Sequence, residues 1–231
     1  MNLAIFYKLS AIFFILVGLG FGISQAGITK IFNYPSILRQ PTNIILQKYH
    51  EGGTLLKFFW TLFAFSSLML APLSGIFYKI LSTPKTPYLI IGTIFGISAG
   101  IFYVLGLMRW TFLASTLSEK YISKNLTATS KETIELVFNS FHVYAGNSIG
   151  ETMGFFCTGL WLFISGFAFL TSSIFPHILG IGFIISGIAV LLGPLEWLGF
   201  KYANKINKIG MKIFMILLIF MALILIFYPY V

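Results

Sequence analysis

The most conspicuous absence in this sequence is aspartate, and charged residues of any kind are few. The 231 residues contain six acidic side chains, all of them glutamate, and charged residues make up 9% of the chain. Without aspartate, neither a paired-aspartate intramembrane protease nor an aspartate-based Mg²⁺ site for phosphoryl transfer can be built. These two classes of enzyme are therefore excluded.

Cysteine is almost as scarce. The single cysteine, Cys157, excludes an internal disulfide and a cysteine-rich zinc site. Because Cys157 lies in an apolar run, we interpret it as a buried, inert thiol. The sequence indicates no metal and no cofactor.

The chain is correspondingly rich in apolar residues. Hydrophobic residues make up 58% of the chain and charged residues 9%. An ordinary soluble domain is about 25% charged. A soluble fold with so few charged residues could not cover its apolar surface. The net charge is +9. Because the lysines flank apolar runs, membrane lipids rather than nucleic acid are the expected partner.

The apolar runs predict an all-α integral membrane protein, a bundle of about six transmembrane helices in a single domain over residues 1–231. A loop is expected over residues 30–57, broken by Pro35 and Pro41, and Pro72 should kink the second span. The predicted spans are residues 9–29, 58–78, 88–115, 149–172, 178–194 and 213–228, with an amphipathic helix over 130–145.

Two features of these segments leave alternatives open. The first span could instead be a cleaved signal peptide, since Ser24-Gln25-Ala26 fits a cleavage site, although its apolar stretch is long for one. Thr129 and Glu132 fit a capping box that would start the amphipathic helix, and this helix can run directly into span four.

Orientation follows from the distribution of lysine and arginine. Loops one, three and five carry twelve of the 15 basic residues, and the opposite side carries three. The positive-inside rule therefore predicts that both termini lie outside the cytoplasm.

Glycines recur at every fourth position in two spans, a spacing that lets helix backbones approach closely in lipid. Packing within one chain is the favoured interpretation, and homo-oligomerisation through one of these faces is the alternative. The two series are Gly92, Gly96 and Gly100 in span three, and Gly146, Gly150 and Gly154 at the start of span four.

Arg109, Glu151 and Glu196 lie in or beside apolar spans, where charges are costly and are candidates for function. A structural role is the alternative, as an Arg–Glu pair or, for Glu196, through proximity to Lys201. We expect Arg109 and Glu151 to be coupled across the bundle by direct contact, because each is isolated in its own helix. A polar stripe on the helix entering span four could line a hydrated cavity: Ser140, Tyr144, Asn147 and Glu151.

Other side chains give weaker signals. Glu135, Asn139 and His142 share a helix face, but a solvated or headgroup-facing surface explains them better than a metal site does. Gly96-Ile97-Ser98-Ala99-Gly100 has the form of a nucleophile elbow, but it lies inside an apolar helix. A basic helical face before span six is expected to meet anionic lipid headgroups: Lys201, Lys205, Lys208 and Lys212.

Three segments resemble a bacterial multi-pass membrane family, the domain of unknown function 4386. They are Gly106-Leu107-Met108-Arg109-Trp110, Phe141–Gly146 continuing to Gly150, Glu151 and Gly154, and Gly193-Pro194-Leu195-Glu196. The loop Leu38–Pro41 with Tyr49–Gly53 adds to the likeness. The resemblance implies a bacterial cytoplasmic-membrane protein and supplies no activity.

Three functional hypotheses follow. The leading one is a non-enzymatic protein that binds or translocates a small or lipophilic ligand in a cavity lined by spans three, four and five, with Arg109 and Glu151 holding a polar group. The second is a membrane-embedded lipid-modifying enzyme with His142 or Glu151 as general base and Arg109 as anion holder. The third is a small membrane scaffold that assembles through its glycine faces.

Overall fold

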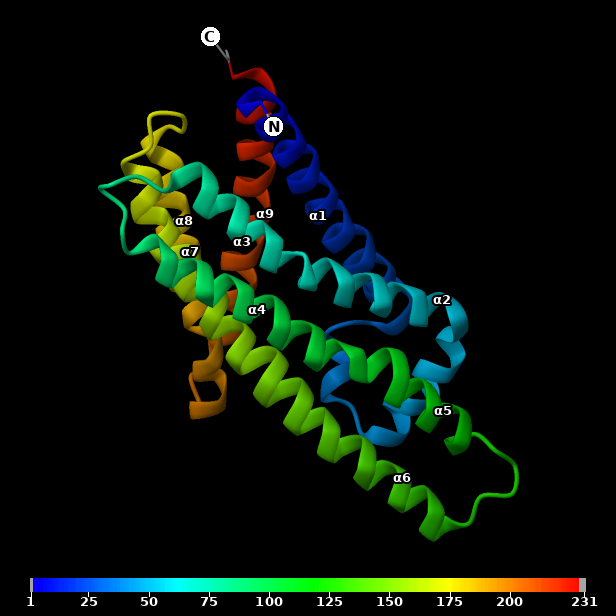
Figure 1. Ribbon diagram of the computed structural model, residues 1–231. Helices are drawn as coiled ribbons and strands as arrows, with labels where there is room; N and C mark the ends of the chain where they lie inside the picture. The colour runs from blue at the N-terminus through cyan, green and yellow to red at the C-terminus, as the bar shows by residue number, and fades with distance from the viewer. Residues whose placement is uncertain (1, 229–231) are drawn as a thin grey trace.

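The computed structural model describes residues 2–228, and over this range it contains helices and no strand (Figure 1). Six helices are long and apolar enough to cross a membrane, which confirms the predicted fold class. The elements are α1 (Leu3–Phe32), η1 (Ser36–Arg39), α2 (Thr42–Leu68), α3 (Leu70–Leu81), α4 (Leu89–Arg109), η2 (Trp110–Ala114), α5 (Ser115–Tyr121), α6 (Ala128–Phe141), η3 (His142–Met153), α7 (Gly154–Leu170), α8 (His177–Leu191), η4 (Gly193–Leu198) and α9 (Ala203–Phe227).

Three of the six helices are much longer than a bilayer requires. They comprise residues 42–81, 89–121 and 128–170, with 40, 33 and 43 residues. At about 1.5 Å per residue each exceeds the roughly 30 Å of a hydrocarbon core. Figure 1 shows the excess at one end, where α5 and α6 form a hairpin, while both chain ends lie at the other. We call these the site end and the terminal end; which of them faces the cytoplasm stays a prediction.

The loop expected over residues 30–57 is mostly helix, so that prediction was wrong. The first helix extends through Lys30 to Phe32, and α2 begins at Thr42. Pro41 precedes the first turn of α2, where a residue without an N–H leaves no hydrogen bond unmade. Gly53, at φ 55° and ψ −150°, bends α2 in a conformation essentially restricted to glycine.

The kink predicted at Pro72 lies slightly earlier in the chain. The helix is interrupted at Met69, between α2 and α3, and Pro72 sits in the first turn of α3. Because Pro72 has no N–H to offer the Leu68 carbonyl, the helical ladder is broken at this point. Gly100 of α4 packs against this break, where a β-carbon would lie 3.2 Å from the Leu68 carbonyl oxygen.

The amphipathic helix starts at a different cap from the predicted one. Thr127, not Thr129, accepts a hydrogen bond from the backbone N–H of Ser130, at 3.2 Å, and α6 begins at Ala128. From there α6, η3 and α7 form one continuous helix to Leu170.

Both predicted glycine series pack inside the chain. A β-carbon on Gly96 would lie 2.5 Å from Ser74 and 2.9 Å from Trp161, and one on Gly106 would lie 2.6 Å from the α-carbon of Gly150. Gly92, Gly146 and Gly154 face Ile164, Arg109 and Tyr103 in the same way. These glycines therefore do not form a free face for a second copy.

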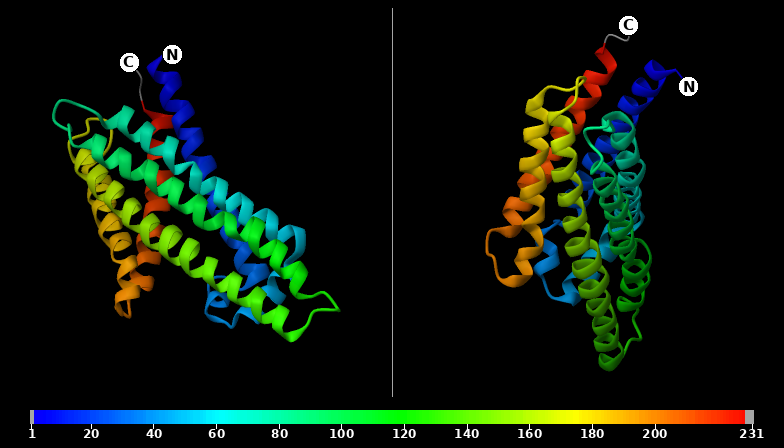
Figure 2. Two further views of the ribbon diagram at one scale, coloured as in Figure 1. Left: turned by 60° about the horizontal axis from the view of Figure 1, so that its bottom comes forward. Right: turned by 60° about the vertical axis from the view of Figure 1, so that its left-hand side comes forward.

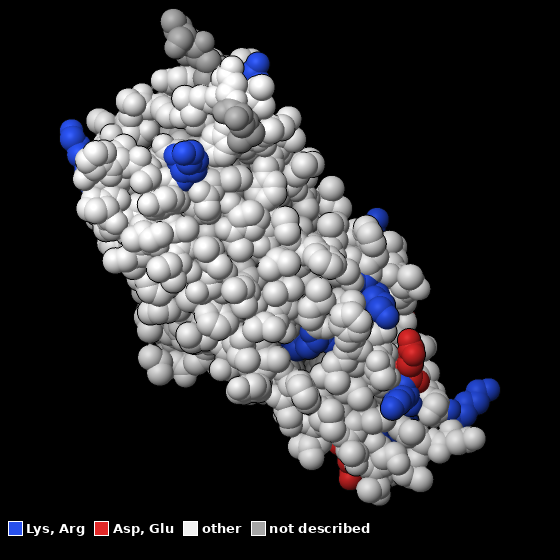
Figure 3. Space-filling model, in the orientation of Figure 1, with Lys and Arg blue, Asp and Glu red and all other residues white. Residues whose placement is uncertain are grey.

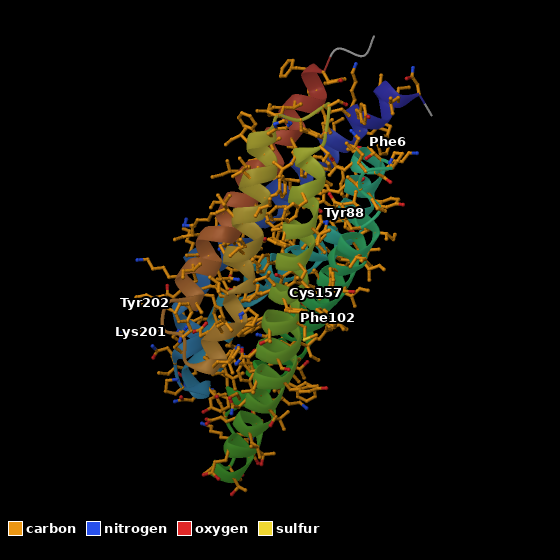
Figure 4. The ribbon with its side chains drawn as sticks, turned by 90° about the vertical axis from the view of Figure 1, so that its left-hand side faces the viewer. Phe6, Tyr88, Phe102, Cys157, Lys201 and Tyr202 are labelled. Atoms are coloured by element: carbon orange, nitrogen blue, oxygen red, sulfur yellow. The ribbon has the colours of Figure 1, made fainter. Side chains whose placement is uncertain are left out.

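The buried core divides into two clusters. The terminal cluster joins α1, α3, α4, α7, α8 and α9 around Phe77, Trp161, Phe183 and Phe214. Cys157 and Phe102, on α7 and α4, lie at its site-end margin (Figure 4). The aromatic cluster joins α1, α2, η2 and α6 at the site end, around Phe32, Tyr49, Trp60, Trp110 and Phe138.

The two ends differ in charge as well. On the face shown in Figure 3, the acidic side chains gather at the lower, site end. All six glutamates belong to segments of this half: Glu51, Glu119, Glu132, Glu135, Glu151 and Glu196.

Candidate ligand-binding site

A cavity of about 100 Å³ lies between the two clusters, enough for several water molecules or a small ligand. It was expected between spans three, four and five, but α8, the fifth span, contributes none of its lining. The lining residues are Phe21, Tyr34, Leu38, Trp60, Phe63, Ser67, Tyr103, Gly106, Leu107, Arg109, Trp110, Gly146, Gly150, Glu151, Phe155 and Met211. Spans one, two, three, four and six and the loop before α2 therefore enclose it.

Arg109 is the cationic group of this cavity. Its side chain is 9% exposed, its Nη1 donates a hydrogen bond to the Gly106 carbonyl, and its guanidinium carbon lies 5.1 Å from the ring centroid of Trp110. The guanidinium lies over Gly146, which has no side chain to obstruct it. Its Nε has no hydrogen-bond partner. A guanidinium with an unused N–H this deeply buried is costly, so the site favours an acceptor at this position.

Glu151 is the anionic group of the same cavity, and it is half-buried. The direct contact predicted between Arg109 and Glu151 is not formed, since none of their nitrogen and oxygen atoms approach within 4.0 Å. The reason is the position of the glycines at which α4 and η3 meet. The backbones of α4 and η3 meet at Gly106 and Gly150, while the Arg109 side chain extends over Gly146, one turn away from Glu151.

Both charged residues adjoin π-helical segments. Arg109 immediately precedes η2, and Glu151 lies within the long segment η3. π-Helical turns are rare and are frequent at functional sites. The buried residues of η3 are His142, Gly146 and Gly150, and the two glycines lie against Arg109 and Gly106 of α4.

The same geometry disperses the predicted polar stripe. Ser140 and Tyr144 are exposed, and the Ser140 hydroxyl donates to the Leu136 carbonyl. Asn147 is half-buried, its carbonyl accepting the Thr152 hydroxyl five residues on, and it does not line the cavity. Of the four residues, only Glu151 lines the cavity. Residues that would share one face of an α-helix do not share a face in a π-helix, because the number of residues per turn differs.

His142 is buried in the aromatic cluster, apart from the carboxylates. Its ring stacks on Phe138, 5.5 Å between centroids, and meets Trp110 edge-on at 5.8 Å. Its Nδ1 has no partner. Glu135, predicted on the same helix face, instead accepts a hydrogen bond of 2.5 Å from the Tyr121 hydroxyl. Within residues 2–228, no three His, Cys or Glu side chains are grouped to hold a metal.

A stack of aromatic rings forms one wall of the cavity. The Trp60 and Trp110 rings lie 4.7 Å apart at an interplanar angle of 12°. The Tyr49 hydroxyl donates a 2.5 Å hydrogen bond to the Trp110 carbonyl. The hydroxyl oxygens of Thr61 and Thr111 lie 3.1 Å apart. These contacts hold η2, and with it Arg109, against α2.

The loop of residues 33–41 covers the cavity, a role the sequence did not indicate. Tyr34 and Leu38 line the cavity, and Arg39 forms a 2.5 Å ion pair with Glu196 of η4. Glu196 is thus paired with Arg39 rather than with nearby Lys201. The Tyr34 ring packs edge-on against Trp60, and burial, with a smaller contribution from Glu151, raises the pKa of its hydroxyl above the ordinary value.

The basic residues before span six are all exposed. Lys201 lies in the turn before α9, and Figure 4 shows it beside Tyr202 on the outside of the molecule. The other three lie on α9 itself: Lys205, Lys208 and Lys212. Figure 2 shows the first turns of α9 at the site end, beside η4.

Comparison with known proteins identifies a family, but the description of that family names no activity. The family described as "Domain of unknown function (DUF4386)" matches residues 9–228, nearly the whole chain. Neither the curated proteins nor the solved structures contain a match to this chain.

Proposed function

Because this chain belongs to the DUF4386 family, whose description names no activity, we propose its function from the cavity: it is a multi-pass membrane protein that binds or translocates a small or lipophilic ligand between Arg109 and Glu151. The family resemblance supports a bacterial cytoplasmic membrane as its location.

The observation that carries this proposal is the state of Arg109. A charge at membrane depth is expensive and is ordinarily paired. Arg109 lines a cavity, is 9% exposed and leaves its Nε unpaired, although an acid lines the same cavity. A purely structural arginine would be expected to meet Glu151 directly. The space between them is explained by a ligand that occupies it.

The two rival hypotheses receive less support. An enzyme using His142 as a general base needs this ring near a carboxylate, whereas the ring is enclosed by Phe138 and Trp110. A scaffold assembling through glycine faces needs those faces exposed, whereas Gly96 and Gly150 pack inside the chain.

Co-purification tests the proposal. Met211 and Met215 lie one turn apart on α9 and both pack against the terminal cluster, but of the two only Met211 lines the cavity. Both side chains are half-buried. Met211→Phe should fill the cavity, and Met215→Phe is its matched control. Small molecules extracted from the purified proteins are compared by mass spectrometry. We expect a species bound to wild type and to Met215→Phe that falls at least tenfold in Met211→Phe. Equal extracts from all three proteins would contradict the proposal.

A further inference from the structure

The polar lining of the cavity carries two opposite charges that do not neutralise each other directly. The guanidinium of Arg109 has one N–H donated to Gly106 and an unpartnered Nε. The carboxylate of Glu151 has neither a hydrogen bond nor an ion pair with any residue from 2 to 228. The two groups face one cavity, yet stay more than 4.0 Å apart.

The free part of Arg109 defines what it can bind. With Nη1 occupied by the Gly106 carbonyl, the edge formed by Nε and Nη2 is the free fork of the guanidinium. Such a fork fits two oxygens of a carboxylate or a phosphate. The arginine side of the cavity is therefore suited to an anionic group.

Glu151 further limits which ligands fit the cavity. A simple anion in the cavity would leave Glu151 unpaired and place a second negative charge beside it. A simple cation would do the same to Arg109, and a neutral molecule would leave the two charges apart, with no charged group in contact with either of them. Each of these is unfavourable for buried groups.

We propose that the ligand of this cavity is a zwitterion, whose anionic group binds Arg109 and whose ammonium group binds Glu151. This inference rests on the proposed function and narrows it to a class of ligand. The volume of about 100 Å³ holds a small molecule or the head of a lipid, not a whole lipid. A free amino acid and the phosphoethanolamine head of a phospholipid share the required chemistry.

Matched probes test the charge requirement. Binding to the purified protein is measured by titration with two zwitterions, glycine and phosphoethanolamine. The corresponding anions are acetate and glycerol 3-phosphate, and ethanolamine is the cation. We expect at least one zwitterion to bind wild type tenfold or more tightly than its matched anion and than ethanolamine. Glu151→Gln should abolish that preference, so that the anion binds at least as well as the zwitterion.

Controls keep the result interpretable. Glu132→Gln removes an exposed acid of α6 outside the cavity and should behave as wild type. Arg109→Gln should lose anions and zwitterions alike; if it does not fold, Glu151→Gln carries the test alone. The source of the zwitterion is distinguished in nanodiscs. A lipid source predicts that phosphatidylethanolamine weakens phosphoethanolamine binding and that phosphatidylglycerol does not, and a free solute predicts equal binding in both.

Three results would overturn the inference. If wild type binds each anion as tightly as its matched zwitterion, or if Glu151→Gln leaves the preference unchanged, the ligand is not a zwitterion. If no probe binds while Met211→Phe still removes a co-purified species, the zwitterion is likewise wrong and the proposed function stands. Equal extracts from the Met211 and Met215 variants would instead remove the proposed function itself.

Discussion

The terminal and site ends of this bundle bury aromatic side chains in different ways. At the terminal end, α7 and α8 pack backbone to backbone. A β-carbon on Gly187 would lie 2.8 Å from the Gly159 carbonyl oxygen, and one on Gly180 would lie 2.8 Å from the Gly166 carbonyl oxygen. Phe169 and Phe183 stack beside this contact at 4.6 Å. The two helices that meet at this contact are regular α-helices.

At the site end the helices depart from regular geometry. Gly53 bends α2, and η2 and η3 are π-helical. Buried polar atoms without a hydrogen-bond partner occur at both ends: on Trp60, Arg109 and His142 at the site end, and on Trp161 and Ser165 of α7 at the terminal end. The comparison teaches that α7 and α8 of the terminal end are arranged for close packing, whereas the site end has an irregular backbone around a cavity that contains a buried charge. Such departures are typical of functional sites.

The first prediction asks which end faces the cytoplasm, and its outcome is all or none. Twelve basic residues belong to the segments that the sequence predicts as loops one, three and five, and they favour a cytoplasmic site end. A reporter that is active only in the cytoplasm should therefore be inactive when fused to the C-terminus and active when inserted in the loop between α5 and α6. The reverse pattern would contradict the orientation.

The second prediction concerns the packing of the terminal end. Gly187→Val places side-chain atoms against the Phe163 amide and the Gly159 carbonyl, neither of which can move without shifting α7. We expect a loss of about 3 kcal/mol in the free energy of unfolding. Thermal unfolding in detergent measures it. Gly18→Val is the control, because a β-carbon there meets nothing within 4 Å; equal losses in both variants would show that close packing is not the cause.

The third prediction concerns the bend of α2 at the site end. Gly53→Ala forces a β-carbon onto a backbone at φ 55°, which should cost about 1–3 kcal/mol. Gly75→Ala, in a regular helix with open space around it, should instead be neutral or stabilising by about 0.5–1 kcal/mol. Chemical unfolding of the two variants decides this. If Gly53→Ala is as stable as Gly75→Ala, the bend is not required.

The fourth prediction concerns the basic face of the site end. Replacing Lys205, Lys208 or Lys212 with glutamine should each weaken the attraction to anionic lipid by about 1 kcal/mol, and less at high salt. Relative binding of phosphatidylglycerol and phosphatidylcholine in mixed micelles measures this. Lys79→Gln, an exposed lysine at the terminal end, is the control. An unchanged lipid preference would show that this face has another purpose.

The smallest effect is expected at His142. His142→Phe removes an unpartnered Nδ1 and keeps an aromatic ring on Phe138, so stability should change by less than about 0.5 kcal/mol. Tyr49→Phe, which loses the hydrogen bond to the Trp110 carbonyl, should cost about 1 kcal/mol under the same conditions. A large loss in His142→Phe would indicate that the imidazole makes a polar contact that matters.

The sequence by itself determined the six apolar helices and the residues that needed explanation. Hydrophobic runs and flanking lysines predict spans because a bilayer leaves the backbone no alternative to the helix. Arg109, Glu151 and Glu196 are identifiable for the same reason, since charges are costly in such runs. No comparable physical signal marks Tyr34 and Leu38, because ordinary loop residues come to line a cavity only when the loop folds back over it.

Tertiary structure alone decided which partners these residues meet. Glu196 pairs with Arg39, 157 positions away in the sequence, and Arg109 lies over Gly146 instead of reaching Glu151. A four-residue glycine spacing does not predict the close α7–α8 contact, because the glycines there recur every seven residues, as at Gly159 and Gly166. Local patterns fix which face of a helix is apolar, but register, π-helical turns and the fold of a loop depend on how all the helices pack at once. For that reason the cavity was predicted correctly between spans three and four, but span five does not line it and spans one, two and six do.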